Sequence, residues 1–414
     1  MSIGDGLELI HPPCYAERGY PHESWTRLRR EAPVHHFEPP GYTPFWAVTK
    51  HADICQISKQ PLLFSNERKG IVVLDREQQR ESGEGFAEMK TIIEMDPPAH
   101  RSFRKVASGW FTPRSLARVD AAVDASAREV VDSLAADGEA ECDFVARVAA
   151  AHPLRILSQV LGVPREDEPY ILSLTNQLFS AEDPEFQREG ETRQEQIQRL
   201  GLEFFQYFSK IIADRRSQPR DDLATVLANA QVDGAAMGEI ETLGYYLIVF
   251  TAGHDTTRNA ITGGVRALIE HPAELAKLRD PGLAAPAVEE IVRWTTPVNY
   301  MKRTATRDTE LRGQKIREGD QLAMFYASAN RDEEVFDEPF RFRIDRDPNR
   351  HLGFGIGEHF CLGAHLARRS QRALFSEIGA RVEKLELAGE PENTASSFVA
   401  GIKHLPVRYR FSRR

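Results

Sequence analysis

The sequence has 414 residues, of which 41% are hydrophobic and 28% charged, a composition typical of globular proteins rather than of disordered or fibrous ones. Its 62 acidic and 53 basic residues give a net charge of −9, so we expect no basic face of the kind that binds nucleic acid. The four cysteines are far apart, which argues against a disulfide scaffold or a zinc site and favours a reducing, cytoplasmic setting.

The N-terminal residues have neither the basic nor the apolar segment of a signal peptide. The longest strongly apolar stretch lies around residues 243–250 and is far too short to span a bilayer. We therefore expect a soluble protein with no membrane span.

Residues 1–60 mix turn signals, such as Pro12-Pro13, with short apolar runs, such as 45–48, and we expect a small β-containing lobe there. The polar, glycine-bearing stretch 66–90 predicts a loop region with a short helix. From Pro97 the pattern is largely helical, with prolines in the first turn of a helix. Amphipathic helices are predicted over 115–137, 166–180 and 191–216.

Residues 237–270 predict one long helix, about 50 Å at 1.5 Å per residue, that is apolar over much of its circumference and therefore runs through the interior. After Arg293 we expect extended segments over 302–306, 309–316 and 321–326, then a loop to Cys361, a helix to about 382, and short strands at the end. These elements predict one domain over 1–414, mainly α with small β-sheets (α+β). Its β-rich small lobe would comprise about 1–65, 298–330 and 385–414, and its helical lobe about 97–293 and 350–382.

Cys361 follows three glycines, at 353, 355 and 357, that allow tight positive-φ turns, and it precedes a helix predicted over 364–378. A thiolate at a helix start is stabilised by the unsatisfied N–H groups, and Gly363 leaves room for a flat group beside it. The residues alone leave three readings: a buried structural cysteine, a dinucleotide-binding loop, or a haem-ligand loop. No strand–helix–strand unit accompanies the glycines, which disfavours the second.

Residues 354–363 resemble the cysteine loop of the cytochrome P450 family, Phe-x-x-Gly-x-x-x-Cys-x-Gly, at every fixed position. The resemblance extends from about residue 20 to the end of the chain and implies that Cys361 is the axial ligand of the iron of haem b. It also implies the single-domain fold of the family, a triangular prism with a long central helix across the haem.

The predicted long helix carries Ala252-Gly253-His254-Asp255-Thr256-Thr257. An acid and two hydroxyls within a buried helix are costly unless they are paired or used, although an ordinary polar patch fits the hexapeptide as well. In the family this pattern forms an oxygen-binding groove. The resemblance implies that Asp255 and Thr256 are the catalytic pair for proton delivery and that Gly253 makes room beside the iron.

Glu290 and Arg293 lie three residues apart on a predicted helix and can pair, most simply at the surface. The resemblance implies instead a buried pair joined by Arg346, which would hold the cysteine loop in position. Haem also brings two carboxylates that need cationic partners. The resemblance assigns them to His100, Arg104, Arg303 and His359.

The resemblance implies a haem-thiolate monooxygenase that inserts one atom of O₂ into a hydrophobic small molecule. No flavin or iron–sulfur motif is present, so we expect electrons from a ferredoxin and its reductase. A docking patch of Arg368, Arg369 and Arg372 is one reading of those arginines, and a solvated helix face is the other. Alternatives within the fold are a peroxygenase or an isomerase, and outside catalysis a haem sensor or carrier; Asp255 and Thr256 argue against all of these.

Specificity regions of the family correspond to about 70–93, 174–190, 245–256, 297–301 and 398–405, and most of their residues could equally be ordinary core. The turn at 401–406 resembles that of family members that oxidise terpenes, sterol side chains and methyl-branched lipids, so we expect a terpenoid, steroid or alkyl-aromatic substrate. The candidate pocket residues share an apolar side chain: Val72, Val73, Leu74, Ile92, Ile93, Leu178, Phe179, Val249, Val298 and Val399.

Overall fold

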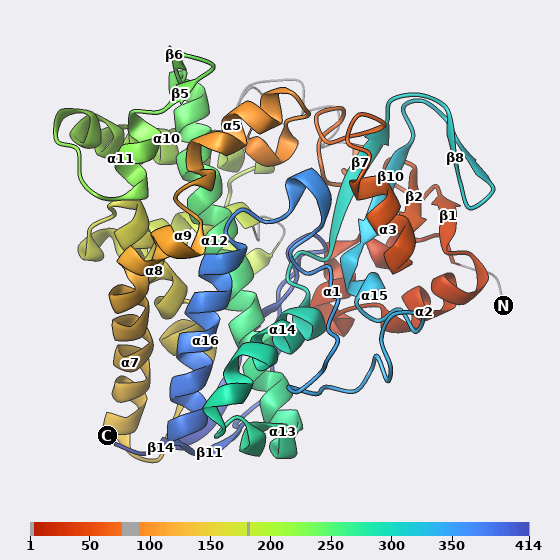
Figure 1. Cartoon of the computed structure of the whole chain (residues 1–414). Helices are drawn as coiled ribbons and strands as arrows, with labels where there is room; N and C mark the ends of the chain where they lie inside the picture. Colours follow the sequence, from red (N-terminus) through yellow and green to blue (C-terminus); the bar gives the residue numbers. More distant parts are fainter. Residues whose placement is uncertain (1–3, 77–90, 180–182, 414) are drawn as a thin grey trace.

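The computed structural model describes residues 4–76, 91–179 and 183–413. Helices make up most of it, with the largest sheet packed at one side of the helical part (Figure 1). The helices are α1 (Pro12–Arg18), α2 (His22–Glu31), α3 (His51–Ser58), α5 (Ala99–Ser108), α6 (Pro113–Leu116), α7 (Asp120–Asp137), α8 (Ala151–Leu161), α9 (Glu168–Phe179), α10 (Arg193–Ser217), α11 (Leu223–Ala228), α12 (Glu239–Glu270), α13 (Pro272–Lys277), α14 (Ala284–Thr295), α15 (Tyr326–Ala329) and α16 (Ala364–Arg381).

The largest sheet has five strands in the order β1-β2-β10-β7-β3, with bounds Val34–Phe37, Phe45–Val48, Gln321–Phe325, Tyr300–Ala305 and Phe64–Ser65. A three-stranded sheet has the order β11-β14-β4, with bounds Val382–Leu387, Pro406–Phe411 and Ala140–Asp143. The two-stranded pairs are β5 (Gln231–Val232) with β6 (Ala235–Ala236), β8 (Thr309–Leu311) with β9 (Gln314–Ile316), and β12 (Glu392–Asn393) with β13 (Ile402–His404). The prediction of a mainly helical chain with small sheets is confirmed.

The long helix α12 confirms the prediction for residues 237–270 and runs past α16 in the middle of the helical part (Figure 1). Its 32 residues correspond to about 48 Å at 1.5 Å per residue. It packs against α8, α10, α11 and α14, so apolar side chains are needed on several of its faces. The main hydrophobic core surrounds it, and two smaller clusters lie about the five-stranded sheet.

Several local predictions were wrong. Residues 1–65 contain strands β1, β2 and β3, as predicted, but also α1, α2 and α3, and Pro12 begins α1, where its missing N–H costs nothing, rather than a turn. Helix α5 begins at Ala99, after both prolines. The extended segment predicted over 309–316 is the hairpin of β8 and β9, which turns at Arg312 (φ 49°) and Gly313 (φ 76°).

The short helix predicted within 66–90 falls largely on residues 77–90, outside the described residues. Across the described ranges, no helix combines the length and apolar character needed to cross a membrane.

Candidate active site

Cys361 lies in a tight loop between the 3₁₀ turn η9 (Gly357–His359) and helix α16. The Cys361 N–H donates to the Phe354 carbonyl oxygen at 2.8 Å, which closes the loop. Gly355 and Gly357 have φ of 69° and 80°, a region that side chains disfavour. A Cβ at Gly357 would also stand 2.4 Å from the Ser58 carbonyl oxygen, so this position needs glycine. The loop thus lies directly against the end of α3.

Cys361 is exposed to a large cavity, which its thiol borders. Desolvation by the surrounding protein raises the pKa of Cys361, against the lowering effects of the Gly363 N–H, Arg104 and Arg368. The net pKa is above the usual value, although the Gly363 N–H at the helix start acts in the predicted direction and favours the thiolate. Bonding to a metal cation would supply the missing stabilisation, because a coordinated thiol is deprotonated.

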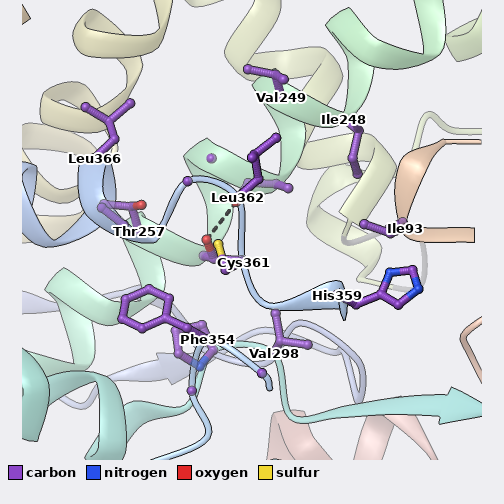
Figure 2. A pocket seen from close by; sticks show the side chains of 18 of the residues that line it. Ile93, Ile248, Val249, Thr257, Val298, Phe354, His359, Cys361, Leu362 and Leu366 are labelled. Carbon is purple, nitrogen blue, oxygen red and sulfur yellow. Dashed lines mark hydrogen bonds between the residues drawn. The ribbon is translucent and has the colours of Figure 1, made fainter. Parts of the chain in front are cut away.

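The cavity encloses about 1820 Å³ free of protein atoms, its mouth included. Figure 2 shows Cys361 and Leu362 on one wall, with Val249 of α12 and Ile93 on others. At Gly363, no atom lies within 4 Å of the place where a Cβ would stand. A flat group therefore has room beside the start of α16.

Four nitrogen-bearing side chains gather at one part of this cavity: His100, Arg104, Arg303 and His359. The imidazole rings of His100 and His359 lie 4.0 Å apart, and the buried atoms His100 Nδ1 and His359 Nε2 have no hydrogen-bond partner. Burial lowers the pKa of His100, Arg104 and Arg303, and burial with the neighbouring cations lowers that of His359 to about 2.

No ion pair to a carboxylate is found for any of these four side chains within the described ranges. Arg104 instead donates to the Phe360 carbonyl oxygen at 2.6 Å, and Arg303 to that of Lys302 at 2.9 Å. Donors of this kind, desolvated and short of acceptors, fit an anionic group. The residues present therefore fit haem: a cysteine sulfur, a flat open space and donors for two carboxylates.

Helix α12 presents Gly253 and Thr256 to the cavity. The Thr256 hydroxyl donates to the Ala252 carbonyl oxygen at 2.7 Å, as helical threonines often do, and its lone pairs are left to accept. Gly253 packs closely, since a Cβ there would approach Leu157 Cδ2 to 3.0 Å. Glycine therefore keeps α12 close to α8 at the cavity wall.

Asp255 does not line the cavity, although Gly253, Thr256 and Thr257 do. Its side chain is 1% exposed and its Oδ1 lies 3.2 Å from Arg258 Nη2 and 3.3 Å from His254 Nδ1. Its Oδ2 is buried and has no hydrogen-bond partner. The predicted pair is thus divided, with Thr256 at the cavity and Asp255 in a charged network beside it.

Glu290, Arg293 and Arg346 come together in a fully buried cluster rather than at the surface. Arg293 donates twice to the Glu290 carboxylate, at 2.7 and 2.8 Å, and Arg346 Nε donates at 3.1 Å. Arg346 also donates to the carbonyl oxygens of Asp337 and Arg341. The cluster ties α14 to the chain that leads into the cysteine loop.

The predicted basic patch is not formed by its three arginines. Arg368 donates to Glu289 at 2.6 and 2.8 Å and stacks on Phe354, and Arg369 donates to Asp120 and Asp124. Arg372 alone is exposed. The first two charges are neutralised because acidic residues of α14 and α7 face α16, which the linear sequence does not reveal.

Half of the predicted pocket residues line the cavity: Ile92, Ile93, Val249, Val298 and Val399. Val72, Val73 and Leu74 do not, because their segment packs beside the five-stranded sheet, where Leu74 accepts a hydrogen bond from Thr43. Leu178 packs into the main core. The Phe179 side chain lies outside the described residues.

The cavity also takes residues beyond the candidate pocket residues. Ile248, Met301 and Phe398 lie within the predicted specificity regions, whereas Asn66, Phe111, Tyr326 and Ile356 lie outside them. Ile248 and Phe398 are neighbours of predicted residues, and an apolar run of the same helix or loop signalled both. Asn66 and Tyr326 carried no such signal, since only the folded chain brings β3 and α15 to this wall.

The family model of cytochrome P450 matches residues 66–280 and 283–378. Among curated proteins, cytochrome P450-terp of a Pseudomonas species is 40% identical, over 97% of this chain and 96% of its own. The steroid C26-monooxygenase of Mycolicibacterium smegmatis is 35% identical, over 99% and 95%. A methyl-branched lipid omega-hydroxylase of Mycobacterium tuberculosis is 39% identical, over 93% and 90%.

Solved structures agree with these matches. The crystal structure of CYP108D1 from Novosphingobium aromaticivorans has a TM-score of 0.90 and 40% sequence identity, and the match covers 98% of each chain. Mycobacterium marinum cytochrome P450 CYP268A2, solved in complex with pseudoionone, has a TM-score of 0.83 and 35% identity, with 93% and 94% covered.

Proposed function

This chain belongs to the cytochrome P450 family and is a monooxygenase that hydroxylates hydrophobic molecules, and we propose that its substrate is a terpenoid, a steroid or an alkyl-aromatic compound. The observation that carries the proposal is the division of the cavity. Among the described residues that line it, the arginines and histidines are the four that fit haem carboxylates, and η3 (Ile92–Glu94), Ile248 and Val249 of α12 and residues 398–399 form an apolar wall.

We assign haem b as the cofactor, with Cys361 as its iron ligand and His100, Arg104, Arg303 and His359 as partners of its carboxylates. When bound through a thiolate, haem supplies the activation of O₂, one atom of which enters a C–H bond of the substrate while the other leaves as water. Gly363 leaves space for the flat group beside the start of α16, whereas the space that Gly253 saves at the cavity wall is taken by Leu157 of α8.

The apolar wall binds and orients the substrate by excluding water from it. Ile93, Ile248 and Val249 lie on one side, and Val298 on another (Figure 2). Burying a hydrocarbon against such a wall gains about 25 cal/mol per Å², and a charged or strongly polar group would lose its hydration without a partner. The wall thus favours substrates with an extended hydrocarbon surface.

Protons reach the cavity along α12 in this proposal. The Thr256 hydroxyl is the last group on the proton path, since it borders the cavity and can accept a hydrogen bond while it donates to the Ala252 carbonyl oxygen. Asp255 is the supply, and its unpartnered Oδ2 is the oxygen that we assign to proton transfer. Arg258 and His254 hold the other oxygen in place.

We propose a ferredoxin and its reductase as electron donors, in the cytoplasm. With Arg368 and Arg369 paired internally, the contact on the Cys361 side of the protein relies on Arg372 and on exposed apolar surface such as Phe360. Charge reversal at Arg372 should slow reduction by ferredoxin modestly, and reversal at Asp120, which removes one of the two acidic partners of Arg369, should not.

A spectral-shift screen tests the substrate class. Purified ferric protein is titrated with terpenes, steroids, alkylbenzenes and a matched set of polar compounds, and the products of the strongest hits are identified with NAD(P)H, ferredoxin, reductase and O₂. Hydroxylated products from the hydrophobic set support the proposal. Spectral shifts with charged or polar compounds alone would refute it.

A further inference from the structure

The loop between β12 and β13 carries two residues of the substrate wall, Phe398 and Val399. On one side it is held by the chain that follows α14. The Asn299 N–H donates to the Phe398 carbonyl oxygen at 2.9 Å, and the Ala400 N–H donates to that of Pro297 at 3.0 Å. These bonds fix the middle of the loop, and the Thr394 N–H, which donates to the Gly401 carbonyl oxygen at 2.9 Å, joins its two ends to each other.

Both ends of the loop meet one carboxylate that comes from the connection between α9 and α10. Asp183 Oδ2 accepts the Ala395 N–H at 3.0 Å, and Asp183 Oδ1 accepts Lys403 Nζ at 2.9 Å. Oδ1 also accepts the Glu185 N–H at 3.1 Å, so Asp183 caps the short turn η7 (Pro184–Phe186) as well. Asp183 is 1% exposed although its connection lies between two surface helices.

The contact continues as a row of alternating charges. Lys403 lies 3.2 Å from Glu185, Glu185 lies 3.0 Å from His404, and His404 lies 2.7 Å from Asp143 at the end of β4. The inner pair is the buried one, since the side chains of Asp183 and Lys403 are 1% and 16% exposed, whereas those of the outer members are 27% to 37% exposed. Solvent screens the outer pairs, so the inner pair carries most of the interaction.

We propose that Asp183 is a positioning residue for substrate selection: it clamps both ends of the 394–403 loop and thereby fixes Phe398 and Val399 against the substrate. The inference deepens the proposed function, because it assumes that hydrophobic substrates occupy this cavity. It adds that selectivity depends on a residue that does not line the cavity, and that Asp183 with η7 and this wall move as one unit.

Loss of the Asp183 carboxylate would loosen the two ends of the loop and leave its middle held. Its middle would keep the bonds to Pro297 and Asn299, so the fold would persist. Its ends would lose a backbone acceptor and a buried ion pair, and Lys403 would be left with only the half-exposed Glu185. Side chains that are already ordered lose less conformational entropy when a ligand binds. A looser wall would therefore reduce the difference in affinity between ligands that fit well and ligands that fit poorly.

Hydrogen–deuterium exchange tests the clamp without any substrate. We expect amides in peptides covering 394–403 to exchange at least tenfold faster in haem-loaded Asp183→Ala than in the parent protein, with Asp183→Asn between them. Asp221→Ala is the matched control, because Asp221 pairs with Arg118 and has no contact with the loop. Unchanged exchange in 394–403 would overturn the inference and leave the proposed function standing.

Spectral titrations with limonene and progesterone then test selection. The parent protein should discriminate between these probes, and Asp183→Ala and Lys403→Met should reduce the ratio of their Kd values about tenfold, whereas Asp221→Ala should not. A simple loss of stability would lower the thermal midpoint and leave the ratio unchanged, and that result would also overturn the inference. If neither probe shifts the parent spectrum, the proposed substrate class is wrong and the inference that depends on it fails too.

Discussion

Substitution Glu290→Gln is expected to destabilise the protein far more than the same substitution one residue earlier, Glu289→Gln. Both carboxylates lie on α14 and both bind arginine. Glu290 is fully buried and accepts from Arg293, Arg346 and the Arg343 N–H, whereas Glu289 is 28% exposed. Comparing the two substitutions tests the effect of burial, because the helix, the residue type and the chemical change are the same in both.

The magnitude follows from the buried charges that remain. In Glu290→Gln, Arg293 and Arg346 keep their positive charge without an anion, and the amide offers one acceptor oxygen where the carboxylate offers two. Breaking a buried ion pair in this way costs about 3–5 kcal/mol. For Glu289→Gln, solvent screens the lost interaction with Arg368, and we expect about 1 kcal/mol or less.

Equilibrium urea unfolding of the haem-loaded protein measures both values, followed by far-UV circular dichroism and by haem absorbance. Because Arg346 lies on the chain that leads into the cysteine loop, Glu290→Gln should also lower haem occupancy at equal protein concentration. If Glu290→Gln destabilises no more than Glu289→Gln, the burial argument is refuted. A double variant with Arg346→Met should recover part of the loss, since it removes one of the unpaired charges.

Four further outcomes are expected. Cys361→Ala should abolish the reduced carbonyl spectrum of thiolate-ligated haem while far-UV circular dichroism is retained; an unchanged spectrum would mean that another residue holds the iron. Gly357→Ala should lower the free energy of unfolding by about 2 kcal/mol or more, because the new Cβ would combine a positive φ with contact to the Ser58 carbonyl oxygen. Gly363→Ala should leave the stability of the apoprotein unchanged and weaken haem binding, as measured by haem titration. Asp255→Asn should lower kcat about 100-fold with little change in substrate Kd, and an equal loss in both would contradict its place in proton supply. Burial lowers the pKa of His404, but its hydrogen bonds to Asp143 and Glu185 raise that pKa above 6.5 overall. The stabilisation that protonated His404 contributes is therefore complete below pH 6.5 and is lost as the pH rises through the raised pKa. Over that pH range the thermal midpoint should fall in the parent protein and stay constant in His404→Asn.

Features that depend on local sequence were predictable. The glycines and Cys361 form one short loop. The pattern of α12 is apolar over much of the circumference for about nine turns, which indicates a buried helix. The resemblance of short motifs then placed His100 and Arg303, which are far apart in the chain, at one cavity, and the structure brings them together there.

Features that depend on which surfaces meet were not predictable. Arg368 and Arg369 are an open basic face in the sequence, and only the packing of α16 against α14 and α7 supplies their acidic partners. Val72 and Val73 are as apolar as Ile92 and Ile93, yet the first two cover a sheet and the second two line the cavity. Hydrophobicity fixes that a side chain is buried but not against what.

The supports of the Cys361 loop and the wall that meets the substrate come from different parts of the chain. The loop rests on α3 through Gly357 and on α14 through Gly353, which faces Val292 at 2.5 Å from a would-be Cβ. The wall opposite comes from η3, α12 and the 394–403 loop. Related proteins can therefore change wall residues and accept new substrates while the chemistry at the sulfur stays constant. Substitutions at Ser58 or Val292, by contrast, would disturb the Cys361 loop whichever substrate the enzyme oxidises.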